Sequence, residues 1–85
     1  MTPDEITSAR NRLGNMWGLG RSLTAAELGR ALRMGSREPG EMIRRYETGS
    51  TKVPGQTSAA IAMMLAGMLP PDGIAVIYAG NRKPR

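Results

Sequence analysis

The chain contains no cysteine and no histidine. This absence excludes a disulfide framework, a thiolate nucleophile, a Ser–His dyad and a zinc site with nitrogen or sulfur ligands. Phenylalanine is absent too, and one tryptophan and two tyrosines leave the core to aliphatic side chains and seven methionines. The acidic residues form no clustered pair in a recognisable pocket pattern. We therefore expect a protein that is not an enzyme and that binds no cofactor or metal.

Long apolar runs are also lacking, since no stretch reaches the roughly 18 residues that a membrane-spanning helix needs. The N-terminus is polar and carries Asp4 and Glu5, which is not typical of a signal peptide. A cytoplasmic location without a membrane partner is therefore expected. The 85 residues suffice for one small domain. Because such a domain buries only about 60% of its unfolded surface, a second subunit would help to stabilise it.

Basic residues outnumber acidic ones and give the chain a formal net charge of +5. They concentrate in residues 21–52, where seven face four acids, and in the last residues of the tail. The stretch between, residues 53–79, carries a single charge, Asp72. This distribution suits a partner with a phosphate backbone, although charges that merely solubilise the surface remain an alternative.

Helix-start signals occur twice in the first third of the chain. Thr2 and Glu5 have the spacing of a capping box, and Thr24 and Glu27 repeat it. We expect the first helix to fade near residue 14 or 18 and the second to end before residue 35. Two more helices are expected at residues 39–47 and at about 55–68. The predicted fold is all-α, a compact bundle of four to five helices.

The C-terminal residues depart from the helical pattern. Residues 70–73 read as a stop and a turn, and the β-branched and aromatic residues 74–78 predict one short strand. A lone strand needs a partner, either its own copy in a second subunit or, as an extended tail, the helix at 55–68. We divide the chain into a helical domain, residues 1–69, and a dimerisation strand with a basic tail, residues 70–85. The expected dimer contacts are Met64, Met68, Ile74, Val76 and Tyr78.

Residues 23–49 carry the clearest functional pattern, two short helices joined by a glycine-bearing connection. A helix-turn-helix reader of DNA places its second helix in the major groove, where the arginine fork matches the O6 and N7 acceptors of guanine. The expected base-reading residues lie at the start and on the outer side of the helix at residues 39–47: Arg37, Gly40, Glu41, Arg44 and Arg45. Met42, Ile43 and Tyr46 are expected to form the inward face of the helix at residues 39–47, and Gly40 is placed near its exposed start. Glu41 either accepts from a cytosine amino group or orients a neighbouring arginine.

Contacts to phosphate are expected around the same two helices. Free N–H groups at the start of the helix that follows Thr24, with hydroxyls beside them, form a possible anion site. The expected backbone contacts are Ser22, Thr24, Ser36, Ser50 and Lys52. Such contacts fix the position of a protein on DNA but carry no sequence information. The plainer alternative is that the arginine pair only solvates an exposed helix face.

Three segments together resemble the phage-repressor-like helix-turn-helix family, the XRE or Cro-type regulators. They are residues 23–32 (LTAAELGRAL), residues 43–49 (IRRYETG) and residues 53–55 (VPG) with the alanine-rich helix that follows. The resemblance covers about residues 1–68. It departs from the family at Ala25, where members often carry glutamine, and in a longer connection at residues 34–40. It implies a bundle of four or five helices and operator binding as a dimer, usually with repression.

The predicted function is a sequence-specific regulator of transcription, a repressor or autorepressor. It would bind double-stranded DNA as a homodimer at an inverted repeat, as phage-related regulators do. Two alternatives stay open. One is an antitoxin that grips a toxin, and the other is a module whose apolar C-terminal third binds another regulator or partner protein.

Overall fold

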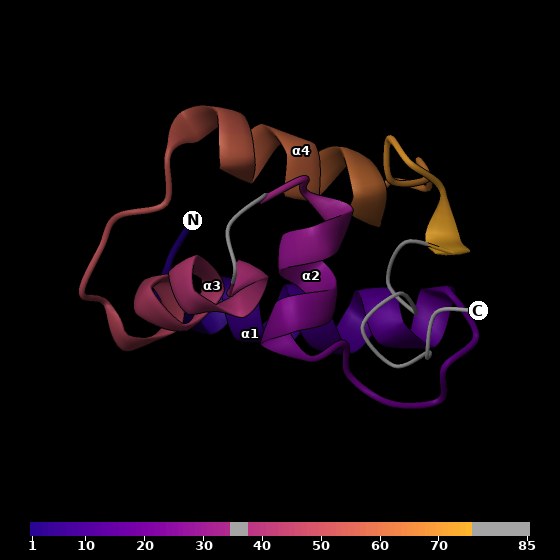
Figure 1. Ribbon diagram of the computed structural model, residues 1–85, viewed down its shortest axis with the longest axis horizontal. Helices are drawn as coiled ribbons and strands as arrows, with labels where there is room; N and C mark the ends of the chain where they lie inside the picture. Colours follow the sequence, from indigo (N-terminus) through magenta and orange to yellow (C-terminus); the bar gives the residue numbers. More distant parts are fainter. Residues whose placement is uncertain (35–37, 76–85) are drawn as a thin grey trace.

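Residues 1–34 and 38–75 are described by a computed structural model of the chain (Figure 1). These residues form four helices and no strand: α1 (Pro3–Met16), α2 (Ala25–Ala31), α3 (Pro39–Thr48) and α4 (Gly55–Leu65). The all-α fold predicted from the sequence is confirmed for this part of the chain. The longest of the four helices has 14 residues, and none is both long and apolar enough to cross a bilayer.

Both predicted capping boxes form. The Thr2 hydroxyl accepts from the Glu5 N–H at 3.2 Å, and the Thr24 hydroxyl accepts from the Glu27 N–H at 3.1 Å. Each glutamate carboxylate in turn accepts from the backbone N–H of its threonine, at 2.6 Å and 2.8 Å. In α1 this backbone hydrogen bond lowers the pKa of the exposed Glu5 carboxylate from its ordinary value. The short helix α2 is thus fixed at its first turn.

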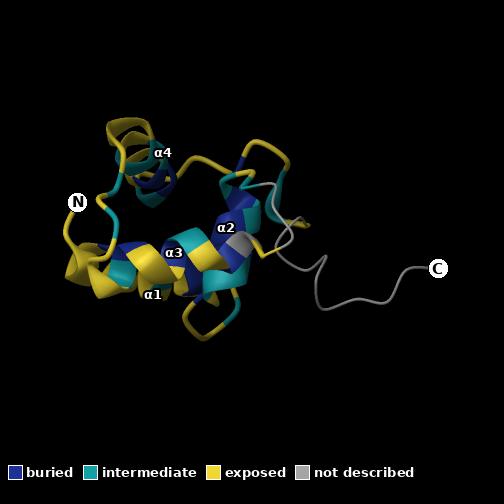
Figure 2. Cartoon of the chain, turned by 60° about the vertical axis from the view of Figure 1, so that its left-hand side comes forward, coloured by how far each residue is buried: buried dark blue, intermediate teal, exposed yellow. Residues whose placement is uncertain are grey.

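The core lies where α1, α2 and α3 meet and where α4 packs against α1 (Figure 1). α2 runs at a steep angle to α3 in this view, and α1 passes behind both. Figure 2 shows α2 as the most buried element, and none of its residues is exposed. The buried apolar side chains are Ile6, Ala9, Leu13, Leu23, Leu28, Ala31, Ile43, Tyr46, Ile61 and Met64.

α2 ends in a left-handed turn at Arg33, whose φ is 60°. The Arg33 N–H donates to the Arg30 carbonyl at 3.1 Å, and the Met34 N–H donates to the Gly29 carbonyl at 2.9 Å. Glycine usually fills such a position, and another residue costs about 1–2 kcal/mol there. The exposed Arg33 side chain donates two hydrogen bonds to the Asp72 carboxylate, at 3.0 Å and 2.8 Å.

α4 ends at Leu65, three residues before the predicted end at residue 68, so this boundary was wrong. The reason is Gly67, which adopts a φ of 116° and turns the chain. The Met68 N–H then donates to the Met63 carbonyl at 3.1 Å, and the Gly67 N–H donates to Met64 at 3.0 Å. Because the apolar sequence continues to Leu69, hydrophobicity alone does not mark this end.

The predicted strand also begins differently in the structure. Residues 74–75 form a 3₁₀ turn instead of extended backbone, so the strand prediction is wrong for these two residues. The preceding turn is closed by the Gly73 N–H, which donates to the Pro70 carbonyl at 2.9 Å, and Ile74 packs against the core. Residues 76–78 of the predicted strand lie outside the described residues.

Candidate nucleic-acid interface

α3 has two sharply different faces. Ile43 and Tyr46 are 0% and 3% exposed and point into the core, and Met42 is half-buried beside them. Arg44 and Arg45 lie on the opposite, exposed side. The helical period explains this separation, because residues three apart share a face, whereas the two residues between them in the sequence lie on the other side. The inward and outward faces predicted for α3 are thereby confirmed.

Each arginine of the exposed face forms an ion pair with an acidic side chain near the start of α3: Arg44 with the N-cap residue Glu38, and Arg45 with Glu41. The Arg44 Nη2 donates to Glu38 Oε1 at 3.2 Å, and the Arg45 Nη2 donates to Glu41 Oε2 at 2.9 Å. We call these two contacts the two outer ion pairs. All four side chains are more than half exposed. Of the two roles predicted for Glu41, the structure shows the pairing with a neighbouring arginine.

Gly40 is buried, and its predicted place at an exposed helix start is wrong. A Cβ atom at this position would lie 2.7 Å from the Ala26 backbone nitrogen and 3.0 Å from the Ala25 carbonyl carbon. The start of α3 therefore packs directly on the first turn of α2, and only a residue without a side chain permits that distance. Gly40 sets the approach of the two helices and is no longer a candidate for base reading.

The predicted phosphate contacts fall into three groups. Ser50 and Lys52 are exposed after the end of α3, and Ser22 is exposed before α2. Thr24 is exposed but its hydroxyl already caps α2, and the Ser50 hydroxyl forms a hydrogen bond of 2.9 Å with that of Thr48. Ser36 lies outside the described residues, as does Arg37, which was predicted to read bases.

The predicted anion site at the start of α2 is occupied by a side chain of the protein. Glu27 is only 1% exposed, and its carboxylate accepts from the Thr24 N–H. Arg21 donates to both of its oxygens at 2.9 Å, which compensates the buried charge. These contacts stabilise the first turn of α2.

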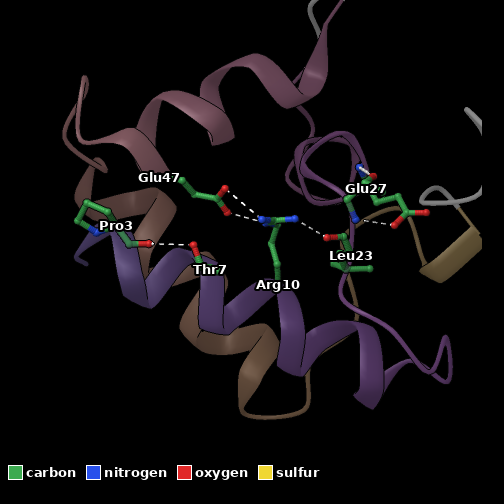
Figure 3. A network of polar contacts seen from close by, with 7 residues as sticks. Pro3, Thr7, Arg10, Leu23, Glu27 and Glu47 are labelled. Carbon is green, nitrogen blue, oxygen red and sulfur yellow. Dashed lines mark hydrogen bonds and ion pairs between the residues drawn. The ribbon is translucent and has the colours of Figure 1, made fainter.

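Arg10 is the most important side chain that the sequence did not identify. The Arg10 side chain is 21% exposed, and its guanidinium binds both carboxylate oxygens of Glu47, whose side chain is 17% exposed. Its remaining arm donates to the Leu23 carbonyl at 2.8 Å, just before α2 (Figure 3). One side chain of α1 thus holds the end of α3 and the entry to α2 together. No local pattern reveals a pair that is 37 residues apart.

The predicted dimer contacts are divided in the structure. Met64 is 3% exposed and packs in the core of the single chain, although it also lines the apolar groove described below, so its role as a dimer contact stays a prediction. Met68 is 53% exposed, Ile74 is half-buried, and Val76 and Tyr78 lie outside the described residues. Two further apolar side chains near Met68 are exposed, although they were not among the predicted dimer contacts: Met63 and Leu69. With Met68 they line an apolar groove of about 240 Å³ between α4, Leu32 and Pro71.

Within residues 1–34 and 38–75, no group of three or more acidic side chains could hold a metal ion. No protein-family model matches the chain, and neither a similar curated protein nor a similar solved structure was found. The function therefore has to be inferred from the geometry of the chain itself.

Proposed function

We propose that this chain is a sequence-specific, DNA-binding regulator of transcription that acts as a repressor. The observation that carries the proposal is the exposed face of α3, from which Arg44 and Arg45 project while the opposite face is buried. In this proposal α2 and α3 serve as the two helices of a helix-turn-helix, with α3 in the major groove.

A reading helix has to be held rigidly, because base contacts require exact placement of the side chains. α3 is fixed on three sides of the described structure: Gly40 packs on α2, Ile43 enters the core, and Glu47 is held by Arg10. Its arginine face meanwhile stays accessible. This combination of a fixed backbone and exposed guanidinium groups supports recognition of base edges.

Contacts to phosphate would come from the ends of the same helix pair. Ser50 and Lys52 follow α3 and are exposed, and Ser22 is exposed in the loop before α2. Such groups would bind the backbone on either side of the groove that α3 enters.

A dimer would present two copies of α3 to an inverted repeat, because the symmetry of the protein and that of the operator match in such complexes. The apolar surface of Met63, Met68 and Leu69 supports this part of the proposal. It leaves three large apolar side chains half exposed or more in a single chain. Burial of this surface in a second subunit would remove that exposure.

The proposal is tested with a duplex that the wild-type protein selects from a randomised library. Arg44→Ala should weaken binding to the selected duplex by about 1–3 kcal/mol and affect a scrambled duplex less, because a base contact is lost. Arg12→Ala is the matched control, since Arg12 is an exposed arginine on α1. Fluorescence anisotropy measures both affinities.

Two results would count against this function. An equal loss on the selected and scrambled duplexes would reduce Arg44 to a phosphate contact. An equal loss for Arg12→Ala and Arg44→Ala would show that α3 is not the binding face.

A second candidate function is that of an antitoxin or interaction module whose apolar groove binds a partner protein. The groove beside Met63, Met68 and Leu69 favours it. Salt separates the two candidates: binding to DNA weakens steeply as salt rises, whereas an apolar contact does not.

A further inference from the structure

Two kinds of arginine ion pair occur among the described residues. Arg10, Arg21 and Arg33 each bind both oxygens of one carboxylate, so each guanidinium fork is fully engaged with its acid. Arg44 and Arg45 each make a single contact through Nη2. A guanidinium has five N–H donors. Each of the two outer ion pairs therefore leaves most donors of its arginine available.

The position of Glu38 indicates that its carboxylate is not needed by the helix. Glu38 occupies the N-cap of α3, but its side chain makes no capping hydrogen bond. Its carboxylate reaches Arg44, six residues along the chain, and the side chain stays 67% exposed. Both outer acids thus lie on the solvent side, next to the arginines proposed to meet DNA.

We infer that Glu38 and Glu41 are specificity-determining residues that direct Arg44 and Arg45 toward base edges and away from phosphates. This inference rests on the proposed DNA-binding function. The O6 and N7 atoms of guanine are neutral acceptors, so an arginine can bind them while it keeps its carboxylate partner. A phosphate is an anion, and it repels the carboxylate that stands beside the same arginine. The acids therefore weaken contacts to phosphate much more than contacts to bases.

The consequence for binding is a low affinity for DNA of arbitrary sequence. Each outer pair adds one negative charge next to one positive charge, so the exposed face of α3 carries no net charge from these four residues. Attraction to the DNA backbone depends on net positive charge and on the release of counterions from phosphates. Only a DNA sequence whose bases offer acceptors to both the Arg44 and the Arg45 guanidinium groups would gain the full binding free energy of the two arginines.

The test compares Glu38→Gln, Glu41→Gln and the double variant with the wild type on two duplexes. One duplex is selected by the wild type from a randomised library, and the other has the same composition in scrambled order. The double variant should bind the scrambled duplex about three- to twentyfold more tightly, from the loss of two exposed ion pairs. It should tighten the selected duplex by a smaller factor, so that discrimination falls.

Asp4→Asn is the matched control, because Asp4 is exposed, belongs to neither outer pair, and its loss changes the net charge equally. Circular dichroism confirms that each variant keeps its helices. The inference is overturned if Asp4→Asn tightens scrambled DNA as much as the single variants do. It is equally overturned if both duplexes gain the same factor. Absence of any binding by the wild type at low salt would instead refute the proposed function itself, and this inference with it.

Discussion

Arg10 of α1 and Glu47 of α3 are joined at two points, and the same guanidinium also holds the carbonyl of Leu23 (Figure 3). The pair is shielded from water at 21% and 17% exposure, which makes it unlike the exposed pairs on α3. The position of the C-terminal end of α3 therefore depends in part on a side chain that lies 37 residues earlier in the sequence.

Arg10→Ala should lower the free energy of unfolding by about 1–3 kcal/mol, because it leaves a partly buried carboxylate and a carbonyl without their donor. Urea unfolding followed by circular dichroism measures the change. Arg12→Ala, at an exposed position of the same helix, should change it by less than about 0.5 kcal/mol. Equal effects of the two substitutions would contradict a structural role for the Arg10–Glu47 pair.

Gly40→Ala should destabilise the fold by about 1–3 kcal/mol, since the new methyl group forces α3 away from the backbone of α2. Thermal and urea unfolding provide the measurement. Gly55→Ala is the control, because a Cβ atom at Gly55 meets open space at the start of α4. That variant should be neutral or more stable by up to about 1 kcal/mol. A tolerated Gly40→Ala would mean that the two helices are not in close contact.

The Arg33–Asp72 pair should respond to acid. Hydrogen bonds from Arg33 lower the pKa of Asp72 from its ordinary value of 3.8. A depressed pKa stabilises the folded state above pH 3.8, and that contribution is lost as the pH falls through the lower, folded-state value. NMR titration of the Asp72 carboxyl should show this depressed pKa in the wild type. In Arg33→Gln it should return toward 3.8, and an unchanged midpoint would show that the pair does not form in solution.

Met68→Glu combined with Leu69→Glu should convert a dimer into a monomer. Both side chains are more than half exposed in the single chain, so charges there leave the core intact but oppose an apolar interface. Light scattering gives the mass, and Met16→Glu, at another exposed methionine, is the control. A wild type that is already monomeric at high concentration would exclude this surface as a dimer contact.

The helix starts and the two faces of α3 could be predicted from local signals along the chain. Thr2 with Glu5 and Thr24 with Glu27 form their capping boxes as predicted, because such bonds join residues three apart. Periodicity likewise placed Ile43 inside and Arg44 outside. These features need no knowledge of the tertiary fold.

Long-range relationships were not accessible in the same way. The burial of Gly40, the pairing of Arg10 and the inward position of Met64 all depend on how separate helices meet. The turn at residues 74–75 replaced extended backbone although its residues favour strands, since strand propensity yields readily to tertiary context. Hydrophobic pattern could not show these outcomes.

The close packing at Gly14 and Gly40 limits the substitutions that this helix arrangement accepts. A methyl group at Gly14 would overlap the Arg21 carbonyl oxygen, as one at Gly40 would crowd Ala26. Any sequence that adopts the same arrangement therefore needs glycine at both positions, whereas the exposed arginines of α3 can change without disturbing the packing.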